Sequence, residues 1–157
     1  MIEAPDGTDG EHKPVPNSKP LAEVELIIPS RPEYVGVARL AILGVASRMR
    51  FSYDEVEDIR LAVGEACTRS IDRINAEGTD EHAISLRCLI DANRLTIEVR
   101  NPLLQSAPKE AASDPTSLPE GGDLSGVLIR ILMDEVDTEE RPQESAHVLR
   151  MVKYVAR

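Results

Sequence analysis

The chain has 157 residues, enough for one domain with a substantial core, and its hydrophobic content of 41% is that of a globular protein. Its formal net charge is −10, and only 3% of its residues are aromatic. Nucleic-acid surfaces need basic patches and stacking rings, so this composition argues against a nucleic-acid partner and matches a basic protein segment better.

The N-terminal part of the chain differs in composition from the rest. Residues 1–20 carry prolines among glycine and acidic residues, which predicts a flexible tail ahead of a single domain over residues 21–157. The first ten residues lack the basic start and apolar run of a secretory signal, and no stretch reaches membrane-spanning length. We therefore expect a cytoplasmic protein without a membrane partner.

The first elements of the domain are a strand and a helix. Apolar and polar residues alternate over 21–28, which predicts a half-buried strand. The spacing Ser30-x-x-Glu33 is that of a capping box, in which each residue satisfies a backbone N–H near the helix start. It predicts a helix from there to about Met49.

This first helix is apolar on two sides. Leu40 and Leu43 point away from the main stripe, and Arg39 lies near the edge of their face. Such a helix is either covered on both sides within the fold or keeps one side for a partner, and the sequence leaves both alternatives open. The residues of the main stripe are Tyr34, Ala38, Ala41, Ile42, Val45 and Met49.

The hydrophobic pattern after the first helix predicts a second helix, followed by the remaining strands of a sheet and one more helix. A second capping box, Ser52-x-x-Glu55, opens a helix to about Ile74. The order of elements predicts an α/β two-layer sandwich of the α+β class, with a mixed, mostly antiparallel sheet and helices packed on one face. The later elements are strands over 84–90 and 95–99, a long loop over 101–122, a helix over 124–134, a strand near residue 136 and a last strand over 146–155.

Three segments are candidates for a site: GEACTRS (64–70), EVRNPLL (98–104) and PEGGDLSGVLIRILMDEV (119–136). Taken alone, they also fit a solvated helix face, a strand end and a turn before a helix. The histidines and cysteines are isolated and lack the spacing of metal ligands, so no metal site is expected from them.

The order of these segments resembles that of a known family. The stretch RPEYVGVARLAILGVASRMRFSYDEVEDIRLAVGEACTRSI (31–71) is similar to the N-terminal half of the anti-sigma-factor serine kinases, members of the ATPase superfamily of histidine kinases and gyrase. EGGDLSGVLIRILMDEV (120–136) resembles the glycine-rich lid and following helix of that family, and LRMVKYV (149–155) resembles its last strand. The resemblance covers residues 22–155.

The resemblance implies a histidine-kinase-type ATPase fold and a homodimer that holds a sigma factor away from RNA polymerase. It also implies phosphorylation of a serine on an antagonist protein, the anti-anti-sigma factor, which then lets go. An arginine on the first helix of the family contacts both protein partners. This points to Arg39, with Leu40 and Leu43 beside it, as partner-binding residues.

The family's chemistry needs a glutamate that acts on the serine hydroxyl and an asparagine one helical turn on that ligates Mg²⁺. Glu65 matches the glutamate, but Arg69 stands at the asparagine position, and an arginine has no acceptor for a metal. Asn101 stands where an aspartate would receive the adenine amino group. Its amide oxygen could still accept one hydrogen bond.

The loop positions also depart from the family. Leu103 replaces a glycine, and Asp123-Leu124-Ser125 replaces the lid's Gly-x-Gly. Ala146 stands where the family usually has a threonine, at the start of the last strand. Gly121, Gly122 and Gly126 remain, and the resemblance makes them nucleotide-loop residues together with Arg69 and Asn101.

Two hypotheses follow. The favoured one is an anti-sigma-type binding protein with a degenerate ATP site, which would need no cofactor. The alternative is an active ATP-dependent serine kinase, using ATP and Mg²⁺, in which Arg69 contacts phosphate directly. A sensory or scaffold domain with no sigma partner is a third, weaker reading.

Overall fold

A computed structural model describes residues 19–76, 78, 82–103 and 124–156, and every structural statement below concerns these residues. Most of the predicted tail, and Gly121 and Gly122, lie outside them. In chain order the elements are β1 (Ala22–Pro29), the 3-10 turn η1 (Pro32–Tyr34), α1 (Val35–Ala46), α2 (Tyr53–Ala76), β2 (Ala83–Ile90), β3 (Arg94–Pro102), α3 (Leu124–Leu132), β4 (Glu135–Arg141), the 3-10 turn η2 (Pro142–Glu144) and β5 (Ala146–Tyr154).

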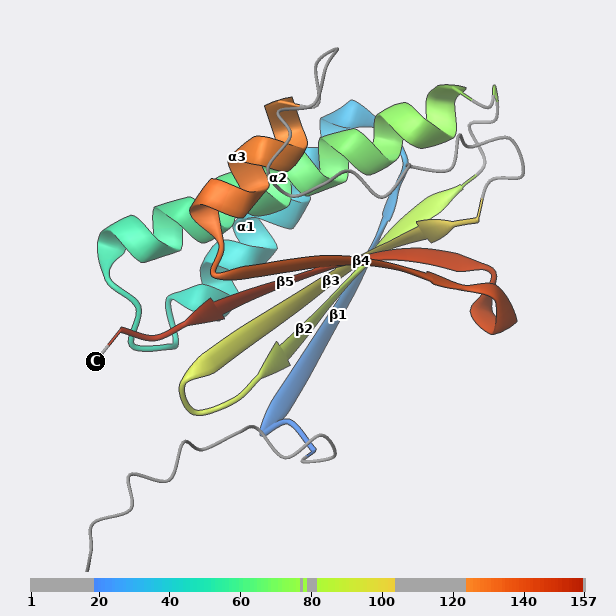
Figure 1. The fold of residues 1–157 in the computed structure, drawn as a ribbon. Coiled ribbons are helices and arrows are strands. Elements are labelled where there is room, and N and C mark those ends of the chain that lie inside the picture. The colour runs from blue at the N-terminus through green and yellow to red at the C-terminus, as the bar shows by residue number, and fades with distance from the viewer. Residues whose placement is uncertain (1–18, 77, 79–81, 104–123, 157) are drawn as a thin grey trace, which may run out of the picture.

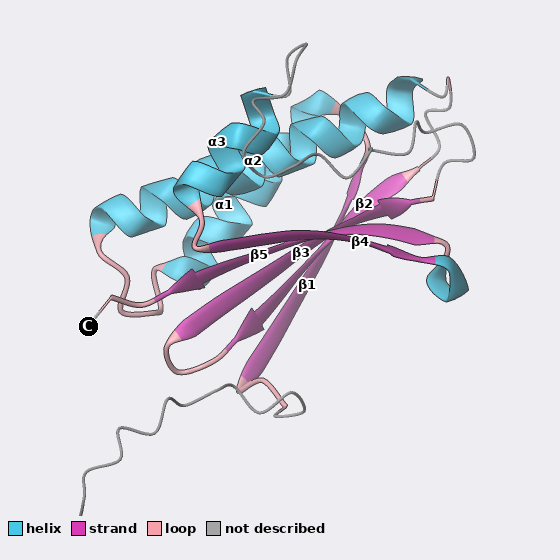
Figure 2. Cartoon of the chain, viewed as in Figure 1, coloured by secondary structure: helices cyan, strands magenta, loops and turns pink. Residues whose placement is uncertain are grey.

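The strands form one sheet with the order β1-β2-β3-β5-β4, and the three helices cover one of its faces (Figure 1; Figure 2). The predicted two-layer α+β sandwich is therefore confirmed. The sequence predicted a mixed sheet, whereas the four described pairings are all antiparallel. β3 and β4 do run in the same direction, but β5 lies between them and pairs with both.

The core fills the space between the helices and the sheet. The strands supply every second residue to it, as the period of a strand facing one layer requires. α2 supplies the largest share among the helices, with Ile59, Val63, Ile71 and Ile74 at most 1% exposed. The inward strand residues include Ile84, Leu86 and Cys88 of β2, Leu95, Ile97 and Val99 of β3, and Leu149 and Met151 of β5.

One of the two predicted capping boxes forms. The Ser52 backbone N–H donates to Glu55 Oε2 at 2.7 Å, and the Glu55 N–H donates to Ser52 Oγ at 3.2 Å. The box predicted at Ser30 is wrong. The Ser30 N–H donates to the His82 carbonyl at 3.1 Å, so the chain still follows the sheet there, and Ser30 Oγ is buried without a hydrogen-bond partner.

The first helix is also shorter than predicted. The chain passes through η1 before α1 begins at Val35, and α1 ends at Ala46 rather than near Met49. Its buried residues are Val35, Ala38, Ile42 and Ala46. Tyr34, which the sequence placed in the inward stripe, is 37% exposed because it precedes the first full helical turn.

The face of the sheet opposite the helices carries ion pairs between strands. Arg87 of β2 lies 2.6 Å from Glu23 of β1 and 4.0 Å from Glu98 of β3. Arg141 at the end of β4 reaches across β5 to Glu98 at 3.3 Å and also contacts Glu139. Glu98 is only 6% exposed at the centre of this arrangement.

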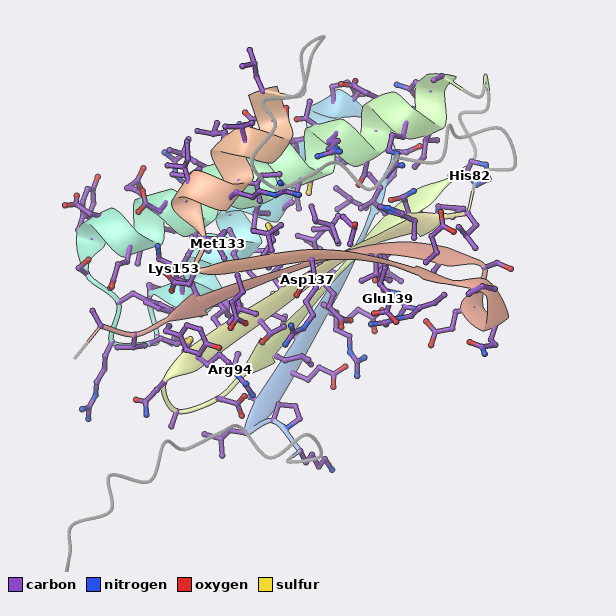
Figure 3. All side chains as sticks on the ribbon, viewed as in Figure 1. His82, Arg94, Met133, Asp137, Glu139 and Lys153 are labelled. Atoms are coloured by element: carbon purple, nitrogen blue, oxygen red, sulfur yellow. The ribbon has the colours of Figure 1, made fainter. Side chains whose placement is uncertain are left out.

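β4 is one edge of the sheet, and it is acidic. Glu135, Asp137, Glu139 and Glu140 are all exposed on this seven-residue strand. Figure 3 labels Asp137 and Glu139 on it. The other edge, β1, carries Glu23 and Glu25 among its exposed residues.

Candidate functional site

The residue at the catalytic glutamate position lies on α2 and faces α3. Ser125 Oγ, in the first turn of α3, donates a hydrogen bond to Glu65 Oε2 at 3.0 Å. The half-buried Glu65 carboxylate is thereby joined to the helix that follows the predicted lid. The same contact brings together two positions, 60 residues apart, that the sequence had linked only through resemblance.

Arg69 lies one helical turn beyond Glu65 and is partly buried. It lines a cavity of about 10 Å³, which has room for roughly one water molecule. Arg73 also lines this cavity, and its Nη1 lies 3.1 Å from His147 Nε2. The other lining residues are Ala66, Ser70, Thr138, His147 and Leu149.

Asn101 lies near the end of β3, on the strand face that packs against α2 at Ser70. It is 4% exposed, and its Oδ1 accepts a hydrogen bond from Ser70 Oγ at 3.4 Å. The strand register places Asn101 opposite His147, and the neighbouring pair places Ala146 opposite Pro102. Ser70, the neighbour of Arg69 on α2, thus bonds to Asn101, and the start of β5 pairs with the same end of β3.

The remaining predicted loop positions are only partly described. Gly126 is the third residue of α3, whereas Gly121 and Gly122 fall outside the described residues. The Leu103 backbone N–H donates to the Ser145 carbonyl at 2.9 Å, which ties the end of β3 to the turn before β5.

Neither metal ligation nor thiol chemistry is evident in the described residues. They contain no group of three or more His, Cys, Asp or Glu side chains that could hold a metal ion. Burial raises the pKa of the Cys67 thiol to about 12 and that of Cys88 to about 11. No described helix is long and apolar enough to cross a membrane.

The predicted partner-binding residues line a groove between α1 and α2. Its volume is about 420 Å³, and Gly36, Arg39, Leu40 and Leu43 of α1 form one wall. Leu40 is 71% exposed and Leu43 is 36% exposed, so neither is covered within the fold. Of the two alternatives for this helix, the structure favours a face left open.

The opposite wall of the groove was not identified from the sequence. It comes from α2, where Arg60 Nη2 lies 2.6 Å from Glu57 Oε2. The spacing of three residues between them is typical of a helix-surface ion pair and was an available signal.

The fold and these positions define a class of protein. Residues 28–153 match the family model described as the histidine kinase-like ATPase domain, and the chain belongs to that family. Several relatives of this chain share one name, serine-protein kinase RsbW. The chain is 34% identical over 144 residues to the serine-protein kinase RsbW of Bacillus pumilus (strain SAFR-032), covering 85% of this chain and 86% of that protein.

Other serine-protein kinases RsbW give nearly the same result. Those of Bacillus thuringiensis (strain Al Hakam) and Bacillus anthracis (strain A0248) are each 34% identical over 142 residues, covering 86% of both chains. The family recognised from the sequence segments is therefore confirmed.

Proposed function

We propose that this protein is an anti-sigma regulator that binds and sequesters a sigma factor, is countered by an antagonist protein, and carries a degenerate ATP site. The observation that carries the proposal is the open groove between α1 and α2. It combines exposed leucines, an apolar surface of the kind that marks interaction sites, with Arg39, a residue type enriched at interface hot spots. The charge of the groove is locally positive, because Arg60 is paired with Glu57 while Arg39 adds a second cation.

The donor set at the nucleotide positions supports the degenerate site. Arg69 supplies no acceptor for Mg²⁺, and the Glu65 carboxylate already accepts a hydrogen bond from Ser125. The buried Asn101 oxygen accepts from Ser70, and it lacks the charge of an aspartate. The described residues at these positions therefore do not suit a Mg²⁺–nucleotide complex.

Nucleotide affinity tests this part of the proposal. Loss of the metal ligand and loss of the charged adenine contact each cost about 1.5–3 kcal/mol of binding free energy. Together they move a micromolar affinity to the millimolar range. We expect isothermal titration calorimetry with ATP and Mg²⁺ to give no saturable isotherm below millimolar nucleotide. A low-micromolar isotherm would instead support the alternative, an active serine kinase.

That alternative has one observation in its favour beyond family membership. Glu65 is retained, and its carboxylate is only half-buried, beside the start of α3. In an active kinase it would orient or deprotonate the serine hydroxyl of the antagonist protein. Radiolabelled phosphate transfer to a serine of that protein, lost in Glu65→Gln, would establish this function in place of the degenerate site.

Partner binding tests the main part of the proposal. Recovery from a native lysate, followed by mass spectrometry, identifies the sigma factor, which is then purified for affinity measurements. We expect Arg39→Ala and Leu43→Asp to weaken its binding roughly 30-fold or more, as hot-spot substitutions do. Ile27→Asp is the control, because Ile27 is 66% exposed on a strand away from the groove. Folded variants with unchanged affinity would exclude this surface.

A further inference from the structure

The Arg39 side chain leaves α1 and lies across α2 at Gly64. The two helices lie side by side in the layer above the sheet (Figure 1). A Cβ atom built on Gly64 would be 2.4 Å from Arg39 Nε, 2.8 Å from Nη2 and 3.0 Å from Cζ. The first two separations are shorter than real Cβ atoms show, so the guanidinium, the end of a flexible side chain, must move to admit any residue other than glycine.

Gly64 has no other evident reason to be glycine. It lies in the middle of a 24-residue helix, where glycine costs stability relative to alanine. Its backbone does not have a positive φ, unlike that of Gly78. The two glycines of α1, Gly36 and Gly44, have nothing within 4 Å of an added Cβ, so the close approach distinguishes Gly64 from both of them.

The position of the guanidinium depends on its packing against Gly64 rather than on a hydrogen bond from Nε. Arg39 Nε is buried and has no hydrogen-bond partner. Cys67, one turn beyond Gly64, is close enough for the Arg39 charge to lower its pKa against the larger effect of burial. The guanidinium thus lies against α2 at Gly64, and the Arg39 side chain also lines the groove.

We propose that Gly64 is a positioning residue for partner binding. Because it has no side chain, the Arg39 guanidinium lies against α2 with its outer N–H groups at the groove. There it meets a carboxylate of the partner, whose neighbouring apolar side chains cover Leu40 and Leu43. This inference rests on the proposed function, since it assigns Gly64 to the same surface.

The test is a double-mutant cycle with Gly64→Ala, Arg39→Ala and the double variant. Gly44→Ala is the matched control, because it makes the same change in a helix where the added methyl meets open space. Binding of the purified sigma factor is measured by calorimetry, and thermal unfolding is followed by circular dichroism. Unfolding does not depend on which partner the protein has, so it separates the two levels of the proposal.

We expect Gly64→Ala to weaken sigma-factor binding at least tenfold and to have no further effect in the Arg39→Ala background. Gly44→Ala should bind as the wild type does. In thermal unfolding, Gly64→Ala should raise the Tm by about 2–4 °C once Arg39 is removed, as the gain in helix propensity predicts, and by less when Arg39 is present.

Two results would overturn the inference. Wild-type affinity in Gly64→Ala, or an equal loss with and without Arg39, would show that Gly64 does not act through the guanidinium. Equal Tm shifts with Arg39 present and with Arg39→Ala would show that the contact between Gly64 and Arg39 does not affect stability. If Arg39→Ala alone leaves binding unchanged, the proposed partner surface fails, and the unfolding cycle still decides whether Gly64 accommodates Arg39.

Discussion

Cys67 on α2 and Cys88 on β2 lie in the core, and their thiols have raised pKa values because burial disfavours the thiolate. At pH 8 a pKa of about 12 leaves roughly one thiolate in ten thousand. Both cysteines are free thiols that pack as small hydrophobic side chains. Their chemistry is therefore that of packing atoms.

We expect neither thiol of the native protein to react with Ellman's reagent within an hour at pH 8, while both react at once in 6 M guanidinium. Because the unfolded thiols ionise near pH 9 and the folded ones only near 11–12, the free energy of unfolding should also fall as pH rises above about 9. Rapid labelling of either cysteine in the native protein would contradict the burial.

The candidate site was predictable at single residues but not in its contacts. Arg69 and Asn101 were identified as substitutions because a motif fixes chemistry position by position. The hydrogen bonds of Glu65 with Ser125 and of Asn101 with Ser70 join segments 60 and 31 residues apart. Such contacts depend on how α3 and β3 pack against α2, which no local pattern in the sequence encodes.

At the level of elements, the two capping boxes show where a local motif loses to the sheet. Ser52 precedes α2 in an exposed connection, where nothing competes with the box. Ser30 directly follows β1, and its N–H is already bonded to the His82 carbonyl. The same four-residue spacing therefore forms a cap in one place and a strand exit in the other.

These serines should respond oppositely to the same substitution. Ser52→Ala should lower the free energy of unfolding by about 1 kcal/mol, because it removes a formed cap. Ser30→Ala should be neutral or stabilising, because it removes a buried hydroxyl that has no partner. Chemical denaturation of the two variants measures both values, and equal losses would contradict the assigned geometry.

The end of α3 is anchored by a buried lysine. Lys153 of β5 is 9% exposed, and its Nζ donates to the Leu132 carbonyl at 2.7 Å and lies 3.8 Å from Asp58 Oδ2 (Figure 3). Leu132 is the last residue of α3, where a cation interacts favourably with the helix dipole. One side chain thus ties α3 to the sheet and to α2.

Lys153→Met should therefore lower the free energy of unfolding by about 1–3 kcal/mol and speed hydrogen exchange in α3. Arg130→Met is the control: Arg130 is exposed on the same helix, and its loss should change stability by less than about 0.5 kcal/mol. A Lys153 variant as stable as this control would show that the anchor contributes nothing.

For the whole molecule, the order and type of the elements were predictable because the two periodicities of 2 and 3.6 residues are strong in this chain. The order of the strands was not. β5 inserts between β3 and β4, a pairing between strands distant in the sequence that no local pattern reveals. The extent of α1 was also missed, because Tyr34 and Met49 fit the helical period but lie outside the α-helix, Tyr34 in the 3-10 turn η1.

The homodimer implied by the family resemblance stays a prediction for the whole molecule. We expect light scattering at tens of micromolar chain to give twice the mass of one chain, because interfaces of standard size hold well below that concentration. A single-chain mass under these conditions would remove the prediction.

The acidic edge strand has a consequence for solubility. An exposed edge offers unpaired N–H and C=O groups to any other strand, and this is a common route to aggregation. On β4 those groups are accompanied by Glu135, Asp137, Glu139 and Glu140, so two copies that approach edge to edge bring like charges together. The strand that closes the sheet therefore also keeps it from growing into a fibre while its carboxylates are ionised.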